Sequence, residues 1–310
     1  MRALVTGGTG FVGSHLCRRL AEEGYEVHAT SASSKPSPDP RVAVHPLEIL
    51  DAGAVETLVG RIVPERIYHL AGQSSPRLWA QDPSRMMQVN VVGTVHVLDA
   101  VRRTGVAARV LVAGSSAQYG EAPASEMPLR EDRPQTPVRA YGVSKVAADL
   151  LAYAAWRTDR IETVRARVFN ANGPGGAWQV FSEFARRIAA LEREGGGELA
   201  VGNLDARRDF SDVRDAARAL FLAMEKGRPG EAYNVCTGRA TRVGDVLDLL
   251  CKEARVPIAA RKDPSLLRAA DESVIVGDPG KLARDAGYAP RIPLAQTALD
   301  TLEYERTRTP

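Results

Sequence analysis

Cysteine is scarce in this 310-residue chain, which also lacks long apolar runs and a strong excess of either charge. Three scattered cysteines, Cys17, Cys236 and Cys251, suit neither a disulfide framework nor a zinc site, which predicts a reducing, cytoplasmic compartment and no metal. No apolar run approaches the roughly 18 residues of a membrane span, and the segment MRALVTGG meets glycine before a signal-peptide core develops. We therefore expect no membrane association and no export.

The charge balance narrows the range of partners. The net charge is only +3 and both signs are interspersed, so neither a nucleic acid nor an anionic membrane surface is an expected partner. With 44% hydrophobic and 25% charged residues, the composition is ordinary for a globular protein. Small anionic ligands remain compatible with this composition.

Lysine is also scarce, because only six of the 41 basic residues are lysines and Lys145 is the only one between Lys35 and Lys226. A compact ammonium on a flexible stem differs chemically from a planar guanidinium, so an isolated lysine suggests a place where arginine cannot substitute. Lys145 follows Tyr141 by four residues in YGVSK, a spacing that puts both side chains on one face of a helix. We expect the ammonium to lower the phenol pKa from about 10, making the pair a tuned general acid or base.

Short strand-like segments alternate with amphipathic helical patterns along the first half of the chain. This alternation predicts an α/β fold, a Rossmann-type doubly wound parallel sheet with a smaller C-terminal α/β substrate lobe. We expect the dinucleotide-binding domain over residues 1–169, with 207–236 returning to it, and the lobe over 170–206 and 237–310. The predicted strands cover residues 2–6, 25–30, 41–45, 66–71, 109–113 and 162–169.

A glycine-rich turn lies between the first predicted strand and the first helix. The segment TGGTGFVG places Gly7, Gly10 and Gly13 there. Glycine permits close approach of the backbone to a pyrophosphate, and the helix N-terminus supplies unpaired amides with a favourable dipole. The motif in this context predicts dinucleotide binding.

The end of the second predicted strand bears on the choice of cofactor. NAD-selective proteins place an acid there on the ribose hydroxyl, whereas this chain has Thr30, Ser31, Ala32, Ser33, Ser34 and Lys35. Hydroxyls and a lysine suit a 2′-phosphate better. We therefore favour NADP(H), with NAD(H) as the alternative.

Five motifs occur along the first half of the chain: TGGTGFVG, HLAGQ at 69–73, Asn90 in QVNVVGT, Ser115 in AGSSAQYG, and YGVSK. Together they resemble the extended short-chain dehydrogenase/reductase family of nucleotide-sugar enzymes. The resemblance implies that Ser115 completes a catalytic triad with Tyr141 and Lys145. It also implies further cofactor contacts, from Phe11, Val12, Ser31, Ser33, Glu48, Ile49, Leu70, Ala71, Gly72 and Asn90.

The second half of the chain is similar to the branch of that family that contains GDP-mannose 4,6-dehydratase and GDP-4-keto-6-deoxy-mannose reductase. The matching strings are FNANGPGG (169–176), VGNLDARRDFSDVRD (201–215), YNVCTG (233–238), LLRAADES (266–273) and GYAPRIPL (287–294). By this resemblance a GDP-linked keto-deoxysugar is the expected substrate. Its implied contacts are Ser75, Ser116, Asn170, Arg208, Arg268 and Glu272, with the arginines on the diphosphate, a geometry that guanidinium suits.

Ala117 separates the chemistries within this branch. The dehydratases that the chain resembles carry glutamate there, and the GDP-fucose synthases carry cysteine there and histidine at the position of Gly175. Neither Ala117 nor Gln118 can shuttle protons, so we expect simple ketoreduction to a GDP-6-deoxy-hexose of the GDP-D-rhamnose type. Two alternatives stay open, a nucleotide-sugar 4-epimerase with tightly bound NAD and a non-catalytic dinucleotide-binding sensor. A homodimer through helices near 83–104 and 141–158 is expected by analogy.

Overall fold

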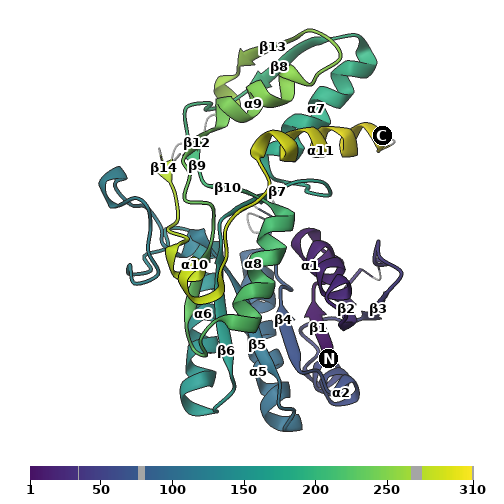
Figure 1. The fold of residues 1–310 in the computed structure, drawn as a ribbon, viewed down its shortest axis with the longest axis vertical. Coiled ribbons are helices and arrows are strands. Elements are labelled where there is room, and N and C mark those ends of the chain that lie inside the picture. The colour runs from purple at the N-terminus through teal and green to yellow at the C-terminus, as the bar shows by residue number, and fades with distance from the viewer. Residues whose placement is uncertain (34, 76–80, 267–273, 309–310) are drawn as a thin grey trace.

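The computed structural model describes residues 1–33, 35–75, 81–266 and 274–308. A seven-stranded parallel sheet forms its lower half (Figure 1), with the strand order β11-β6-β5-β4-β1-β2-β3. The order reverses between β1 and β4, which confirms the predicted doubly wound α/β fold. The strands are β1 (Arg2–Thr6), β2 (Glu26–Ser31), β3 (Val42–Pro46), β4 (Arg66–His69), β5 (Arg109–Ser115), β6 (Thr163–Val168) and β11 (Ala232–Val235).

Helices cover both faces of this sheet because each presents one apolar stripe to it. On one face the buried core joins the sheet to α1 (Phe11–Glu22), α8 (Val213–Lys226) and α10 (Gly280–Ala286). On the other face it joins the sheet to α2 (Ala52–Ile62), α5 (Gly93–Thr104) and α6 (Ala140–Thr158). The short helix α4 (Pro83–Met87) and a π-helical turn at Gln88–Val92 lead into α5. Among the described helices, none combines the length and apolarity needed to cross a membrane.

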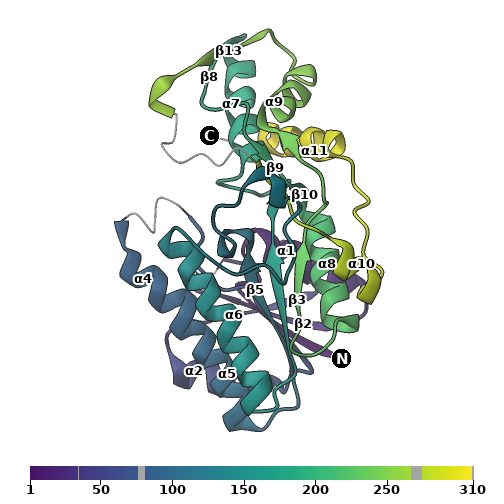
Figure 2. The same ribbon diagram turned by 90° about the vertical axis from the view of Figure 1, so that its left-hand side faces the viewer.

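A smaller lobe sits beyond the carboxyl ends of the strands (Figures 1 and 2). It has its own hydrophobic core, built by α7 (Val180–Glu194), α9 (Val243–Lys252) and α11 (Leu294–Thr307). Its short strands pair as β7 (Asn170–Asn172) with β10 (Phe210–Asp212), β8 (Gly197–Val201) with β13 (Ile258–Lys262), and β9 (Arg207–Arg208) with β12 (Thr241–Arg242) and β14 (Val274–Ile275).

The chain passes between the two parts more than once. After β10 it returns to the sheet through α8 and β11, and β11 pairs with β6 at the sheet edge. Helix α10 also packs on the sheet side, whereas its residues were predicted to belong to the lobe. Leu282 and Ala286 are buried in the same core as α8, and burial of these apolar side chains holds α10 against the sheet.

The buried carboxylate of Asp209 links the segments of the chain that run between the sheet and the lobe. Its carboxylate accepts hydrogen bonds from the backbone amides of Thr237, Gly238 and Gly277 and from the Thr237 hydroxyl, at 2.7–3.3 Å. Burial raises the pKa of this carboxyl, and the hydrogen bonds oppose that rise. Asp209 lies next to Arg208, which lines the cavity between the sheet and the lobe. The hydrogen bonds of Asp209 therefore also position this arginine.

Candidate active site

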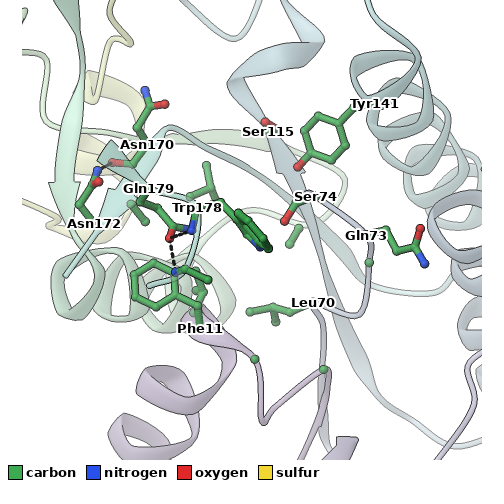
Figure 3. A pocket seen from close by; sticks show the side chains of 18 of the residues that line it. Phe11, Leu70, Gln73, Ser74, Ser115, Tyr141, Asn170, Asn172, Trp178 and Gln179 are labelled. Carbon is green, nitrogen blue, oxygen red and sulfur yellow. Dashed lines mark hydrogen bonds between the residues drawn. The ribbon is translucent and has the colours of Figure 1, made fainter. Parts of the chain in front are cut away.

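A cavity of about 1190 Å³ lies between the carboxyl ends of the sheet strands and the lobe. Pockets for one drug-sized ligand occupy roughly 300–1,000 Å³, so this cavity is larger than one such ligand requires. Figure 3 shows side chains from both walls converging on it. The sequence-predicted residues that line it are Gly7, Gly10, Phe11, Val12, Gly13, Ser31, Ser33, Glu48, Ile49, Leu70, Ala71, Gly72, Ser115, Ser116, Tyr141, Lys145, Asn170 and Arg208.

The glycine turn after β1 leaves the N-terminus of α1 open toward this cavity. Gly7 has a φ of +68°, and a Cβ there would lie 2.9 Å from the Ala71 backbone. A Cβ on Gly13 would lie 2.3 Å from the Gly7 carbonyl oxygen. Gly10 precedes the helix without a side-chain cap, and no acidic residue lies in the first turn. Backbone amides and the helix dipole are thus available for an anion such as a pyrophosphate.

Hydroxyl groups and a lysine line the cavity where β2 ends. The Thr30 hydroxyl accepts a hydrogen bond from the Gly7 amide at 3.2 Å, and the Ser31 hydroxyl accepts one from the Lys35 amide at 3.1 Å. Ser33 and Lys35 line the same end of the cavity. This arrangement fits a 2′-phosphate, because it offers hydroxyl donors and an ammonium and no carboxylate of its own.

An ion pair also lines the cavity. Glu48, which follows β3, accepts a hydrogen bond at 2.9 Å from Arg85 of α4. Both side chains line the cavity and are about half exposed, at 48% and 41%. Exposed pairs of this kind contribute little to stability. Their main effect here is to join two elements that border the pocket.

Ser115, Tyr141 and Lys145 meet at the other end of the cavity. Ser115 ends β5, whereas Tyr141 and Lys145 lie one turn apart at the start of α6. In Figure 3, Ser115 and Tyr141 lie beside each other, with the phenol oxygen turned into the cavity near Ser74. A hydrogen bond between the Ser115 and Tyr141 side chains lowers the pKa of the phenol, while burial raises it more. The group can therefore hold a carbonyl oxygen and supply a proton to it.

The expected effect of Lys145 on Tyr141 is not found in this structure. The Lys145 ammonium donates a hydrogen bond to the Ala113 carbonyl oxygen at 3.0 Å, and the net effect on Tyr141 is a raised phenol pKa. Burial lowers the pKa of Lys145 itself to about 8. A Cβ on Gly72 would lie 3.3 Å from the ammonium nitrogen, so Lys145 borders the cavity wall on the β4 side.

Gln118 holds Ser115 from behind. Its side-chain oxygen accepts a hydrogen bond from the Ser115 amide at 2.7 Å, and its nitrogen donates to Gln135 at 3.0 Å. Gln135 in turn donates to Asp149 of α6 at 3.4 Å. Gln118 is fully buried, and both the oxygen and the nitrogen of its side-chain amide are hydrogen-bonded. Gln118 therefore positions the backbone of Ser115. Ala117, which bonds the Ser115 hydroxyl only through its backbone amide at 3.2 Å, brings no acid or base to the site.

Asn90 and Ser75 were predicted ligand contacts, but neither lines the cavity. The Asn90 amide exchanges hydrogen bonds with the Gln73 backbone at 2.7 and 3.1 Å and donates to the Ser144 hydroxyl at 3.0 Å. The Asn90 side chain therefore braces the backbone of Gln73, which lines the cavity. The Ser75 hydroxyl is buried, without a hydrogen-bond partner among the described residues.

The lobe contributes polar and cationic groups to the opposite wall. Asn170 donates a hydrogen bond to the Asp209 carbonyl oxygen at 3.2 Å, and Arg208 donates to the Arg207 carbonyl oxygen at 2.9 Å. Arg187 of α7 also lines the cavity. Two arginines on this wall favour an anionic ligand. The predicted contacts Arg268 and Glu272 lie outside the described residues.

Sequence reasoning missed several residues of this wall and its surroundings, among them Arg187, Trp178, Gln73 and Ser74. Gln73 ends the HLAGQ motif and Ser74 follows it, so their place beside a strand end was a usable signal. Arg187 and Trp178 had no such signal, because α7 and the loop before it reach the cavity only through lobe packing.

Comparison with known proteins decides the family. The model of the GDP-mannose 4,6 dehydratase family matches residues 4–301 of the chain. The chain belongs to the GDP-mannose 4,6-dehydratase family. This confirms the resemblance read from the motifs.

Relatives within and around this family differ in the reaction they catalyse. The chain is 32% identical to GDP-6-deoxy-D-mannose reductase from Pseudomonas aeruginosa, over 96% of this chain and 94% of that protein. The solved structure of RMD from Pseudomonas aeruginosa complexed with NADPH matches with a TM-score of 0.86, 29% identity and 99% of each chain. A UDP-glucose 4-epimerase with UDP-glucose from Thermotoga maritima matches with a TM-score of 0.90, 28% identity and 99% of each chain.

Proposed function

We propose that this member of the GDP-mannose 4,6-dehydratase family is an NADPH-dependent reductase that converts the C4 ketone of a GDP-4-keto-6-deoxy-hexose into a hydroxyl group. The contact between Ser115 and Tyr141 in the cavity, with no acid or base at Ala117, carries the proposal. Among the described lining residues the carboxylates are Glu48, paired with Arg85, and Glu183 on α7. Neither comes from the segments that carry the triad, so eliminating water has no evident proton carrier.

The triad performs the proton half of the reduction. NADPH, when bound, supplies the hydride that ends on C4. The Ser115 hydroxyl hydrogen-bonds the carbonyl oxygen, and the Tyr141 phenol gives that oxygen its proton. Lys145, whose ammonium borders the same cavity wall beside Gly72, is assigned to binding the ribose of the cofactor. The balanced change is one hydride and one proton added across one carbonyl.

The sheet wall is assigned to the dinucleotide and the lobe wall to the sugar nucleotide. Support for the first comes from the open α1 N-terminus and the hydroxyl groups near Lys35. Support for the second comes from Arg208 and Arg187, which suit a diphosphate. The relative that shares 32% identity is a reductase of a GDP-6-deoxy sugar, which supports guanine as the base.

The direct test mixes purified protein with GDP-4-keto-6-deoxy-mannose and NADPH, follows NADPH oxidation and identifies the sugar by NMR. We expect oxidation and a GDP-6-deoxy-hexose. In the Tyr141→Phe variant we expect turnover to fall at least a hundredfold with NADPH binding intact, because general acid catalysis contributes roughly 10²–10⁴-fold. A loss of only a few fold would refute the acid role of Tyr141.

A 4-epimerase is the second candidate, favoured by the TM-score of 0.90 to the Thermotoga maritima enzyme. An epimerase of this kind returns the hydride to the same sugar and needs no external reductant. Purified protein that carries bound NAD, and that interconverts sugar nucleotides without added NADPH, would establish this reaction in place of the reductase.

The proposal includes a cytoplasmic homodimer. Helices α5 and α6 lie side by side on one outer face (Figure 2), where Val95, Val143, Leu150 and Tyr153 are 39–53% exposed. Such a group of exposed apolar side chains favours burial against a second copy of the chain. Sedimentation of the purified protein tests this, and a monomer at micromolar concentration would rule it out. The low cysteine content supports the cytoplasmic part.

A further inference from the structure

Trp178 is an exposed aromatic side chain inside the cavity. Its residue is 57% exposed, yet it lines the cavity wall on the loop between β7 and α7. Removing an indole from water is strongly favourable. A ligand that covers the exposed indole of Trp178 would therefore gain binding free energy. In Figure 3 its ring stands in the middle of the cavity, between Phe11 and Leu70 on one side and Ser74 on the other.

The loop that carries Trp178 is held firmly by hydrogen bonds. The Gln179 side-chain oxygen accepts from the amides of Ala177 and Trp178 at 2.8 and 3.1 Å. Earlier in the loop, His15 of α1 hydrogen-bonds the Pro174 carbonyl oxygen at 3.0 Å. These bonds tie the backbone that carries the indole to its own loop and to α1 on the sheet side. A binding group that is already ordered lowers the entropy cost of binding a ligand.

The face of the sugar that receives the hydride bears on which group could cover the indole. A carbonyl carbon that accepts a hydride has the donor on one face, so the other face of the sugar ring turns away from the sheet wall. The triad would hold the sugar by its C4 oxygen, and Trp178 lines the cavity from the loop that leads into α7 of the lobe. A hexose ring offers a face of C–H groups, and a 6-deoxy sugar adds an apolar methyl group. Both are suited to an aromatic ring.

We propose that the Trp178 indole is the platform on which the deoxyhexose ring of the substrate packs. This inference rests on the proposed function, because it takes the sugar nucleotide as the ligand of the lobe wall. Ser115 of the triad would bind the carbonyl oxygen, and Ser74 and Ser116 beside it would bind sugar hydroxyl groups. The indole would cover the remaining apolar face.

A fluorescence titration tests the platform without any turnover. The probe is GDP-mannose, which has the sugar and diphosphate but no ketone, and GDP is its sugar-free control. We expect GDP-mannose to quench tryptophan emission and GDP to change it little. The Trp178→Phe variant should lose this quenching, while Trp156→Phe should keep it. Equal quenching by GDP and GDP-mannose, or full quenching in Trp178→Phe, would overturn the proposal.

Kinetics provide the second arm. In Trp178→Ala we expect the KM for the keto-sugar nucleotide to rise about tenfold or more, with a smaller rise in Trp178→Phe, because a phenyl ring restores part of the stacking surface. The Kd of NADPH, read from its own fluorescence, should stay within twofold of wild type. An unchanged sugar KM, or an equal loss of NADPH affinity, would show that the indole does not serve the sugar.

The two arms separate this inference from the proposed function. Wild-type protein that oxidises no NADPH with the keto-sugar, but shows Trp178-dependent quenching by GDP-mannose, would refute the reductase and uphold the platform. Active wild-type protein whose sugar KM is untouched by Trp178→Ala would do the reverse. Trp178 is solvent-exposed, so its replacement is not expected to unfold the protein.

Discussion

Replacing Lys145 by methionine should stabilise the protein while removing its activity. Lys145 is 8% exposed, and burial lowers the pKa of its ammonium from 10.5 to about 8. Each pKa unit corresponds to about 1.4 kcal/mol, so keeping the ammonium charged in the folded protein at pH 7 costs about 3 kcal/mol. The hydrogen bond to Ala113 returns roughly 1 kcal/mol. Methionine has a similar length and no charge, so we expect a net gain in the free energy of unfolding of about 2 kcal/mol.

The pH dependence has a definite sign. Because the folded pKa of Lys145 lies below the unfolded one, the unfolded chain binds more protons than the folded protein between about pH 8 and 10.5. This lysine therefore makes wild-type stability rise with pH in that window, and below it the penalty is constant. Lys145→Met lacks that rise. Its advantage over wild type should shrink by about 1 kcal/mol between pH 7 and pH 9.

Urea unfolding without added cofactor at both pH values measures these differences. Lys252→Met is the matched control, because it makes the same change at an exposed position of α9 and should leave stability nearly unchanged at both values. A Lys145→Met protein that is less stable than wild type at pH 7, or whose advantage is the same at pH 9, would refute the reasoning.

Two further substitutions test how the site is held. Gln118→Met leaves the Ser115 amide without its acceptor, so the free energy of unfolding should fall by about 1–3 kcal/mol and kcat should fall with NADPH affinity retained. Urea unfolding and steady-state kinetics measure this, and an unchanged kcat would deny Gln118 its positioning role. Gly13→Ala would place a Cβ 2.3 Å from the Gly7 carbonyl oxygen and should abolish NADPH binding in a fluorescence titration. Gly53→Ala, where the nearest contact is 3.6 Å, should bind NADPH like wild type.

The predicted strands lie within about two residues of those in the structure, because their periodicity and flanking turns are local properties of the chain. Residues that follow a strand end were equally predictable, since parallel strands bring their carboxyl ends to one edge. Ser115 and Leu70 reach the cavity for this reason. Helix α10 was predicted to belong to the lobe, but it packs in the core of the sheet. Its apolar stripe predicts a buried face and does not distinguish between the two cores.

The sequence by itself determined the sheet, the glycine turn and the spacing of Tyr141 and Lys145, since each depends on residues close together in the chain. Only the tertiary structure decided which groups these side chains contact and how far each is buried. It turns Lys145 toward Ala113 and places Trp178 across from the triad. These outcomes depend on packing between segments far apart in sequence, where burial and hydrogen-bond partners are set by the whole fold.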